Sequence, residues 1–172
     1  PYIISALVQN AKPGKTGEKG LWFILAVQYK QAQADYNNPQ QWRYRYYRDP
    51  RKATISALVK ICANVPEVLA SLNKVCSRYP KDEPFLLAIL QSLASHHQRL
   101  QHDNQDLRQF LEKGMRSKHI NLRKATFALI KTMLSKAKNH AYYRQLLRKM
   151  ITSETDTSLK SQMTSFQKSL SQ

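Results

Sequence analysis

Aromatic and basic residues alternate in the segment WRYRYYR, residues 42–48. Aromatic rings can stack on unpaired bases, and arginine binds phosphates and also stacks on rings, so this composition is typical of surfaces that bind single-stranded nucleic acid. The alternative is a helix that packs Trp42 and Tyr46 into the core and leaves Arg43 and Tyr47 at the rim. The candidate binding residues in this segment are Trp42, Arg43, Tyr44, Arg45, Tyr47 and Arg48.

A second group of cations lies between residues 113 and 149, where lysine and arginine occur without a single acid. Three of them, Lys124, Lys131 and Lys138, would lie on nearly one face of a helix over about 21 Å. Basic helical faces are usually balanced by acids four residues away, so the absence of acids favours an anion-binding face. The candidate residues here are Arg116, Lys118, Arg123, Lys124, Lys131, Lys138, Arg144, Arg148 and Lys149.

Two further motifs are incomplete. The GKT sequence at residues 14–16 is part of a phosphate-binding loop pattern, but Gln9 stands where that pattern needs its first glycine. We therefore interpret this stretch as a mobile basic loop. His96, His97 and His102 lack the four-residue spacing that puts two histidines on one helical face, so a solvated helix end is expected instead of a metal site.

No set of residues suited to nucleophilic catalysis stands out. The acids occur singly apart from Asp82 and Glu83, which suit the start of a helix. The sequence therefore predicts no catalytic residue, no metal ion and no cofactor. It indicates a binding protein and not an enzyme.

The net charge narrows the class of partner. The 172 residues include 28 lysines and arginines against 11 acids, a formal charge of +17. Such an excess opposes compaction unless an anionic partner offsets it. Nucleic acid, an acidic protein or peptide, and an anionic, phosphoinositide-rich membrane surface are the partners that this charge favours.

The two cysteines and the longest apolar run indicate the compartment. Cys62 and Cys76 lie in apolar helical patterns, which suits reduced, buried thiols in an intracellular protein, cytoplasmic or nuclear. The longest apolar run, residues 21–27, is far shorter than the ~20 residues of a membrane-spanning helix. No signal peptide is visible, so we expect a soluble protein without a transmembrane segment.

Seven helices are predicted from residue 51 onward, because apolar residues recur at helical spacing between residues that cap helices. Asn64 and Asp82 are predicted caps, and each is followed by a proline in the first helical turn. The predicted helices cover about 51–63, 82–100, 104–115, 119–137 and 141–151. A further helix follows Asn64 and buries Val68, Leu69, Leu72 and Val75, and the last one is opened by Thr155 or Asp156.

The tetrapeptide RKAT occurs twice, at residues 51–54 and 123–126, near the start of two predicted helices. The offset of 72 residues is twice 36, and another helix begins between the copies near residue 83, as expected for helix-turn-helix units of about 36 residues. In this respect residues 50–170 resemble the HEAT and armadillo-like α-solenoids. That resemblance implies stacked helix pairs with a curved binding surface. The alternative is an irregular helical bundle.

Residues 1–50 are less clearly patterned. Two apolar stretches, at 2–9 and 21–29, flank a polar stretch with glycines, which suits two short helices or a β-hairpin. We favour helices because the residues after 25 are helix-tolerant, and we expect another helix to start at Pro39.

The sequence thus predicts one all-α domain over 1–172, with helix-pair repeats or an irregular bundle in 51–170 and about eight or nine helices. Because the chain begins with Pro1, we expect a processed protein or a piece of a longer one.

The leading functional hypothesis is a basic helical module that binds nucleic acid, RNA or single strands in particular. The alternatives are a protein-interaction scaffold that holds an acidic peptide and a domain that docks on anionic membranes. The sequence leaves the choice among these anions open.

Overall fold

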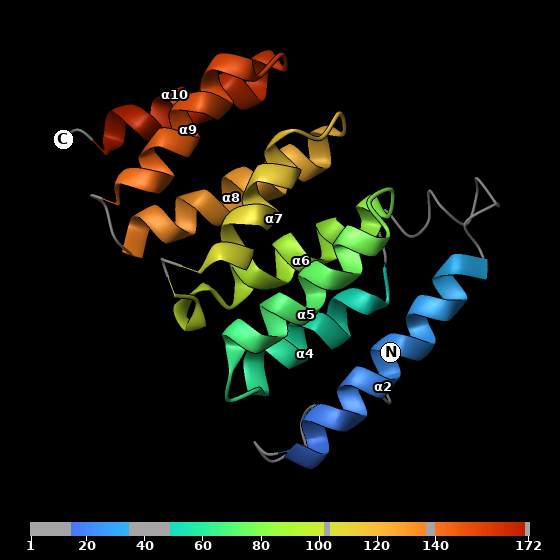
Figure 1. Cartoon of the computed structure of the whole chain (residues 1–172). Helices are drawn as coiled ribbons and strands as arrows, with labels where there is room; N and C mark the ends of the chain where they lie inside the picture. Colours follow the sequence, from blue (N-terminus) through green and yellow to red (C-terminus); the bar gives the residue numbers. More distant parts are fainter. Residues whose placement is uncertain (1–14, 35–48, 102–103, 137–139, 171–172) are drawn as a thin grey trace.

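The structure, a computed structural model, describes residues 15–34, 49–101, 104–136 and 140–170. Within these ranges it is all-helical, as predicted, with eight α-helices, one short 3₁₀ helix and no strand (Figure 1). The helices are α2 (Lys15–Ala34), α4 (Arg51–Ile61), α5 (Val65–Arg78), α6 (Glu83–Ser95), η2 (His97–Arg99), α7 (Gln105–Met115), α8 (Ile120–Lys136), α9 (Ala141–Ser153) and α10 (Thr157–Ser169).

Polar side chains fix where four of these helices begin. Each accepts a hydrogen bond from the backbone amide three residues further on, which satisfies one of the amides that a helix start leaves without an intrahelical partner. Proline follows in the first turn of α5 and α6, where it has no amide hydrogen to lose. The capping residues are Asn64, Asp82, Asn104 and Asp156.

The helices from α4 onward alternate between two layers (Figure 1). Helices α4, α6, α8 and α10 form one layer, and α5, α7 and α9 form the other. Neighbours within a layer run in the same direction, as α4 and α6 show: the bond from the Ser92 hydroxyl to Lys52 O is followed, four residues further along each, by the bond between Ser56 and His96 at the end of α6. Helix α2 packs on the other side of α4, at one end of the stack. The ends of helices in one layer therefore lie together at the same edge of the protein.

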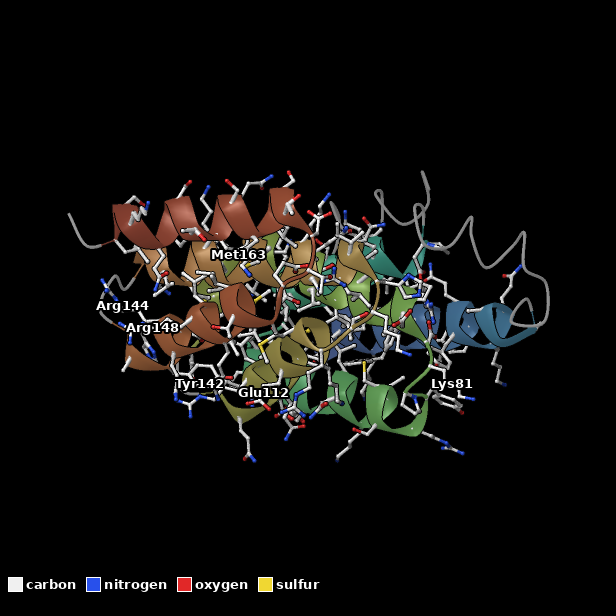
Figure 2. All side chains as sticks on the ribbon, turned by 90° about the horizontal axis from the view of Figure 1, so that it is seen from above. Lys81, Glu112, Tyr142, Arg144, Arg148 and Met163 are labelled. Atoms are coloured by element: carbon white, nitrogen blue, oxygen red, sulfur yellow. The ribbon has the colours of Figure 1, made fainter. Side chains whose placement is uncertain are left out.

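A single apolar core runs between the two layers and holds the stack together. Burial of apolar side chains supplies most of the stabilisation in such a structure. Met163 on the inner face of α10 belongs to this core (Figure 2). Cys62 and Cys76 are buried and free of disulfide bonds, as predicted. Burial raises the pKa of both thiols to about 12, so they are protonated at neutral pH and poor nucleophiles.

Helix α7 approaches α8 closely at Gly114, which is buried. A Cβ atom at this position would overlap the Thr126 hydroxyl of α8 and lie 2.8 Å from the Leu90 Cδ1 atom of α6. Only glycine leaves room for this contact. The close approach fixes the position of the C-terminal end of α7, which carries part of the site described below.

One local prediction is wrong. Residues 15–20 form the first turns of α2 and are not a mobile basic loop. Pro13 and Gly14 precede the helix, and Glu18 in its first turn complements the positive end of the helix dipole. The helices predicted at residues 2–9 and from Pro39 lie outside the described residues. None of the described helices is long and apolar enough to cross a membrane.

Candidate anion-binding site

The first RKAT copy uses its arginine as an internal clamp. Arg51 is fully buried and forms bidentate ion pairs with Asp49 and Asp82, with closest distances of 2.6 Å to each. Its guanidinium also lies over the rings of Tyr29 and Phe85, 5.2 and 4.8 Å from their centroids. Burial alone would lower the Arg51 pKa, but the hydrogen bonds to both carboxylates outweigh it and the pKa is raised. The side chain therefore joins α2, α4 and α6 and cannot meet an external anion.

The second RKAT copy makes a similar but more open clamp. Arg123 donates two hydrogen bonds of 2.9 Å to the Glu154 carboxylate and further bonds to the carbonyls of Ser117 and Lys118. Hydrogen bonding to Glu154 raises the pKa of Arg123. In both copies the arginine reaches an acid 31 residues further along the chain, Asp82 or Glu154. The two clamps thus occupy corresponding places at the starts of helices in the same layer.

The acids near these helix starts are engaged within the protein. Glu83 pairs with His119 at 2.8 Å and accepts a hydrogen bond from the Ser117 hydroxyl. Glu154 also accepts the amides of Thr155 and Asp156. These interactions hold the turn between α7 and α8 against the start of α6 and against the turn between α9 and α10. They also reduce the negative potential at this end of the molecule.

Six exposed cations lie at the same end, where α5, α7 and α9 finish. The order of their contacts shows that α5 and α7 are parallel, because Asn73 meets Asp106 near the start of α7 and Ser77 meets Lys113 near its end. Arg108 lies over the Tyr142 ring at 4.6 Å and ties α7 to the start of α9. We call the six cations the basic edge: Lys74, Arg78, Lys81, Arg116, Lys118 and Lys149.

The basic edge crosses three neighbouring helices. Helices in contact pack about 8–10 Å apart, and α5 packs directly on α7, so the cations extend over more than one helix spacing. Within the described part of the chain, none of the six cations forms an ion pair with an acid. Such a row can bind several phosphates of a polyanion at once.

A hollow of about 450 Å³ opens at the α7–α9 end of the basic edge. It lies between the end of α7, the start of α8 and the end of α9. Two of its cations, Arg116 and Lys149, have no hydrogen-bond or ion-pair partner for their side chains among the described residues. The lining residues are Met115, Arg116, Ser117, Arg123, Lys149, Ser153 and Thr155.

The structure brings together only some of the residues proposed from the sequence. Arg116, Arg123 and Lys149 line the hollow, and Lys118 lies beside it in the turn after α7. Arg123 is taken up by Glu154, so its charge is compensated internally. The predicted residues 42–48 and Lys138 lie outside the described residues.

The remaining predicted cations lie elsewhere on the protein. Lys124 and Lys131 are exposed on α8, and the Lys131 ammonium lies 5.6 Å from the centroid of the Phe166 ring. Arg144 donates to the Leu170 carbonyl at the end of α10. Arg144 and Arg148 lie toward the opposite end of the molecule from Lys81 (Figure 2). None of these four side chains lines the hollow.

Three members of the basic edge were missed from the sequence. Lys74, Arg78 and Lys81 are far in sequence from the acid-free span 113–149, and acids such as Glu67 and Asp82 lie near them in the chain. Only the parallel packing of α5 beside α7 aligns them with Arg116. The recurrence of cations near the ends of alternate helices was the one signal that could have indicated them.

A serine–histidine pair also exists, between α4 and the end of α6. The Ser56 hydroxyl and His96 Nε2 atoms are 2.7 Å apart. Burial, followed by the nearby charges of Lys60 and Arg99, lowers the pKa of His96, and no carboxylate contributes. Among the described residues no acid bonds to His96, and the pair links α4 to the end of α6 by a hydrogen bond. The described residues contain no group of three or more potential metal ligands.

The fold and site define an all-helical protein with a basic edge and an adjoining hollow. No family model, no curated protein and no solved structure matches the chain.

Proposed function

We propose that this protein is a helical binding module for nucleic acid, RNA or single strands in particular, and that the basic edge is its binding surface. The stacked helix pairs would act as repeats of the HEAT or armadillo-like kind, which hold the edge in a fixed shape. The supporting observation is the row of six exposed cations across α5, α7 and α9, with the nearby acids engaged in internal bonds.

Helix dipoles explain only part of this charge. Cations near helix C-termini stabilise the negative end of the dipole, and Arg78 lies in the last turn of α5. Lys81 and Lys118 lie in turns, however, and α9 has no basic residue in its last turn, so Lys149 falls outside that explanation. These three cations support a role in binding an external anion.

Salt dependence of binding tests the proposal. The affinity for a single-stranded RNA should fall as salt rises, and six neutralised phosphates would give a slope of about −4 in log K against log[salt]. A variant with Lys74→Gln, Arg78→Gln and Lys81→Gln should lower the size of that slope by about 2. The matched control, Lys52→Gln, Lys160→Gln and Lys168→Gln, removes the same charge from exposed positions of α4 and α10 and should keep most of the slope.

The same assay shows which class of anion the protein binds and which surface of the protein binds it. Single-stranded RNA, duplex DNA, an acidic peptide and anionic liposomes are compared in parallel. Binding to liposomes or to the peptide without binding to RNA would overturn the proposal. A loss of RNA binding in the Lys124→Gln, Lys131→Gln variant, with none in the basic-edge variant, would move the site to α8.

A further inference from the structure

We propose that the hollow between α7, α8 and α9 binds a phosphate monoester, the phosphate at the end of a nucleic-acid strand. This inference rests on the proposed function, because the basic edge would hold the rest of the strand. The hollow lies at one end of the row of cations, where a strand lying along that row would finish.

Two charges in the hollow lack a counterion. Lys149 projects from α9 and Arg116 from the end of α7, and neither side chain has a polar partner among the described residues. A phosphate monoester carries about −1.5 to −2 charges at pH 7, whereas a phosphodiester in the strand carries one. The two open cations therefore match a terminal phosphate better than an internal one.

The adjoining ion pair keeps the hollow from being acidic. Glu154 is nearly fully buried, with 1% of its side chain exposed, and is bound by Arg123 and by the amides of Thr155 and Asp156. Its charge is therefore neutralised on the protein side. The Thr155 hydroxyl also lines the hollow and can donate to a phosphate oxygen, whereas the Ser153 hydroxyl donates to Lys149 O within α9.

The corresponding place between α5 and α7 shows why this hollow needs a ligand. Counting from the caps Asn64 and Asn104 gives an offset of 40, and from Asn104 to His140 an offset of 36. With these offsets, Lys149 of α9 stands at the position that Lys113 has in α7. Lys113 of α7 in turn stands at the position that Asn73 has in α5.

Between α5 and α7 the lysine finds acceptors in the protein. The Lys113 ammonium donates to Asn73 Oδ1 at 2.9 Å and to the Ser77 hydroxyl at 3.3 Å. Between α7 and α9 the position of Asn73 is taken by another lysine, Lys113, so Lys149 loses the amide acceptor. An anion from outside would supply the missing acceptor.

The turn that forms one wall is held in place before any ligand binds. The Ser117 hydroxyl donates to Glu83 and accepts the His119 amide, and Arg123 holds the carbonyls of Ser117 and Lys118. Little ordering of the wall is then required on binding, which favours affinity.

The test compares strands that differ only in their ends. The same RNA oligonucleotide is measured with a 5′-phosphate, with a 3′-phosphate and with hydroxyls at both ends. The intact protein should bind one of the phosphorylated strands about tenfold or more tightly than the unphosphorylated strand, as expected for a few charge-assisted hydrogen bonds. Inorganic phosphate should compete away that preference.

Substitutions connect the preference to the hollow. In Arg116→Gln, Lys149→Gln the ratio of affinities for the phosphorylated and unphosphorylated strands should fall to about one. The control Lys74→Gln, Arg78→Gln has the same net charge. It should lower the affinity for both strands by the same factor and leave the ratio of the two affinities unchanged. All four positions are exposed, so urea unfolding should show intact folding in both variants.

The outcomes separate this inference from the proposed function. Equal affinity for all three strands would overturn the inference and leave nucleic-acid binding in place. No binding to any strand would overturn both. Binding of a phosphoserine peptide, lost in Arg116→Gln, Lys149→Gln and without any binding of RNA, would assign the hollow to a phosphorylated protein.

Discussion

The two RKAT copies show how one tetrapeptide can serve as a buried joint and as the rim of a site. In the first copy Arg51 is enclosed by two carboxylates and two aromatic rings, with no exposed surface. In the second copy Arg123 pairs with one carboxylate and keeps 15% of its side chain exposed beside the hollow. The difference comes from α2, which covers the first copy and supplies Tyr29. Helix α6 packs on α8 beside the second copy, but among the described residues no aromatic ring lies over Arg123, which stays open on the side of the hollow.

The threonines of the two copies differ in the same way. Thr54 donates to the Gln28 side chain of α2, whereas Thr126 bonds to the Leu122 carbonyl within its own helix and packs against Gly114. The first copy is thus tied to a helix outside the alternating layers. The second is tied to the neighbouring helix α7, which brings Arg116 to the hollow.

Removing each arginine should give the largest contrast. Arg51→Ala leaves Asp49 and Asp82 buried without a counterion, and we expect a loss of about 3–5 kcal/mol in the free energy of unfolding. Arg123→Ala leaves one carboxylate that still accepts two amides, and a loss of about 1–3 kcal/mol is expected. Urea denaturation at pH 7 measures both. Equal losses would show that α2 contributes nothing to the difference between the copies.

A methyl group at Gly114 tests the packing of the second copy. Gly114→Ala should destabilise the protein by about 1–3 kcal/mol, because the new Cβ atom overlaps the Thr126 hydroxyl. The double variant with Thr126→Ala lacks that hydroxyl, so its loss of unfolding free energy should be smaller than the sum of the losses in the two single variants. The control is Lys74→Ala, at the corresponding exposed position of α5, which should change stability by no more than about 0.5 kcal/mol. Strict additivity would contradict the proposed clash.

The Glu154 carboxylate should make the second clamp sensitive to acid. Burial acts to raise its pKa, but hydrogen bonds from Arg123, Asp156 and Thr155 lower it below 4.5 overall. A carboxylate with a lowered pKa stabilises the folded state at neutral pH, and this contribution is lost as pH falls through its folded pKa. The difference in unfolding free energy between the protein and Glu154→Gln should therefore be constant above about pH 5.5 and shrink below pH 4.5. A difference that does not change between pH 7 and pH 3 would contradict the argument.

The helices could be predicted from the sequence because their signals are local. Apolar spacing and the caps Asn64 and Asp82 depend on a few neighbouring residues, and the observed helix starts confirm them. The start of α2 was missed because Gly17 and Gly20 indicate a loop, while packing of the helix on α4 outweighs their low helix propensity.

The candidate site was only partly predictable because it depends on which helices are neighbours. The acid-free span pointed to Arg116 and Lys149, but it also included Arg123, whose partner lies 31 residues away. No local pattern shows that Glu154 would reach back to that arginine. Equally, no local pattern shows that Lys74 would lie in line with Arg116. Tertiary packing determines both of these neighbours. It therefore also determines which cations pair with an acid of the protein and which do not.

The smallest expected effect concerns the stability of the basic edge itself. If its cations serve binding, replacing Lys81 and Lys118 with glutamine should change the free energy of unfolding by no more than about 0.5 kcal/mol each, because both are exposed, lie in turns and pair with no acid among the described residues. Reduced repulsion between like charges acts in the stabilising direction at low salt. Urea denaturation at low and at about 0.5 M salt measures this, with Arg123→Ala as the destabilised reference. A loss comparable to that of Arg123→Ala would show that the edge, like the clamps, has a structural role.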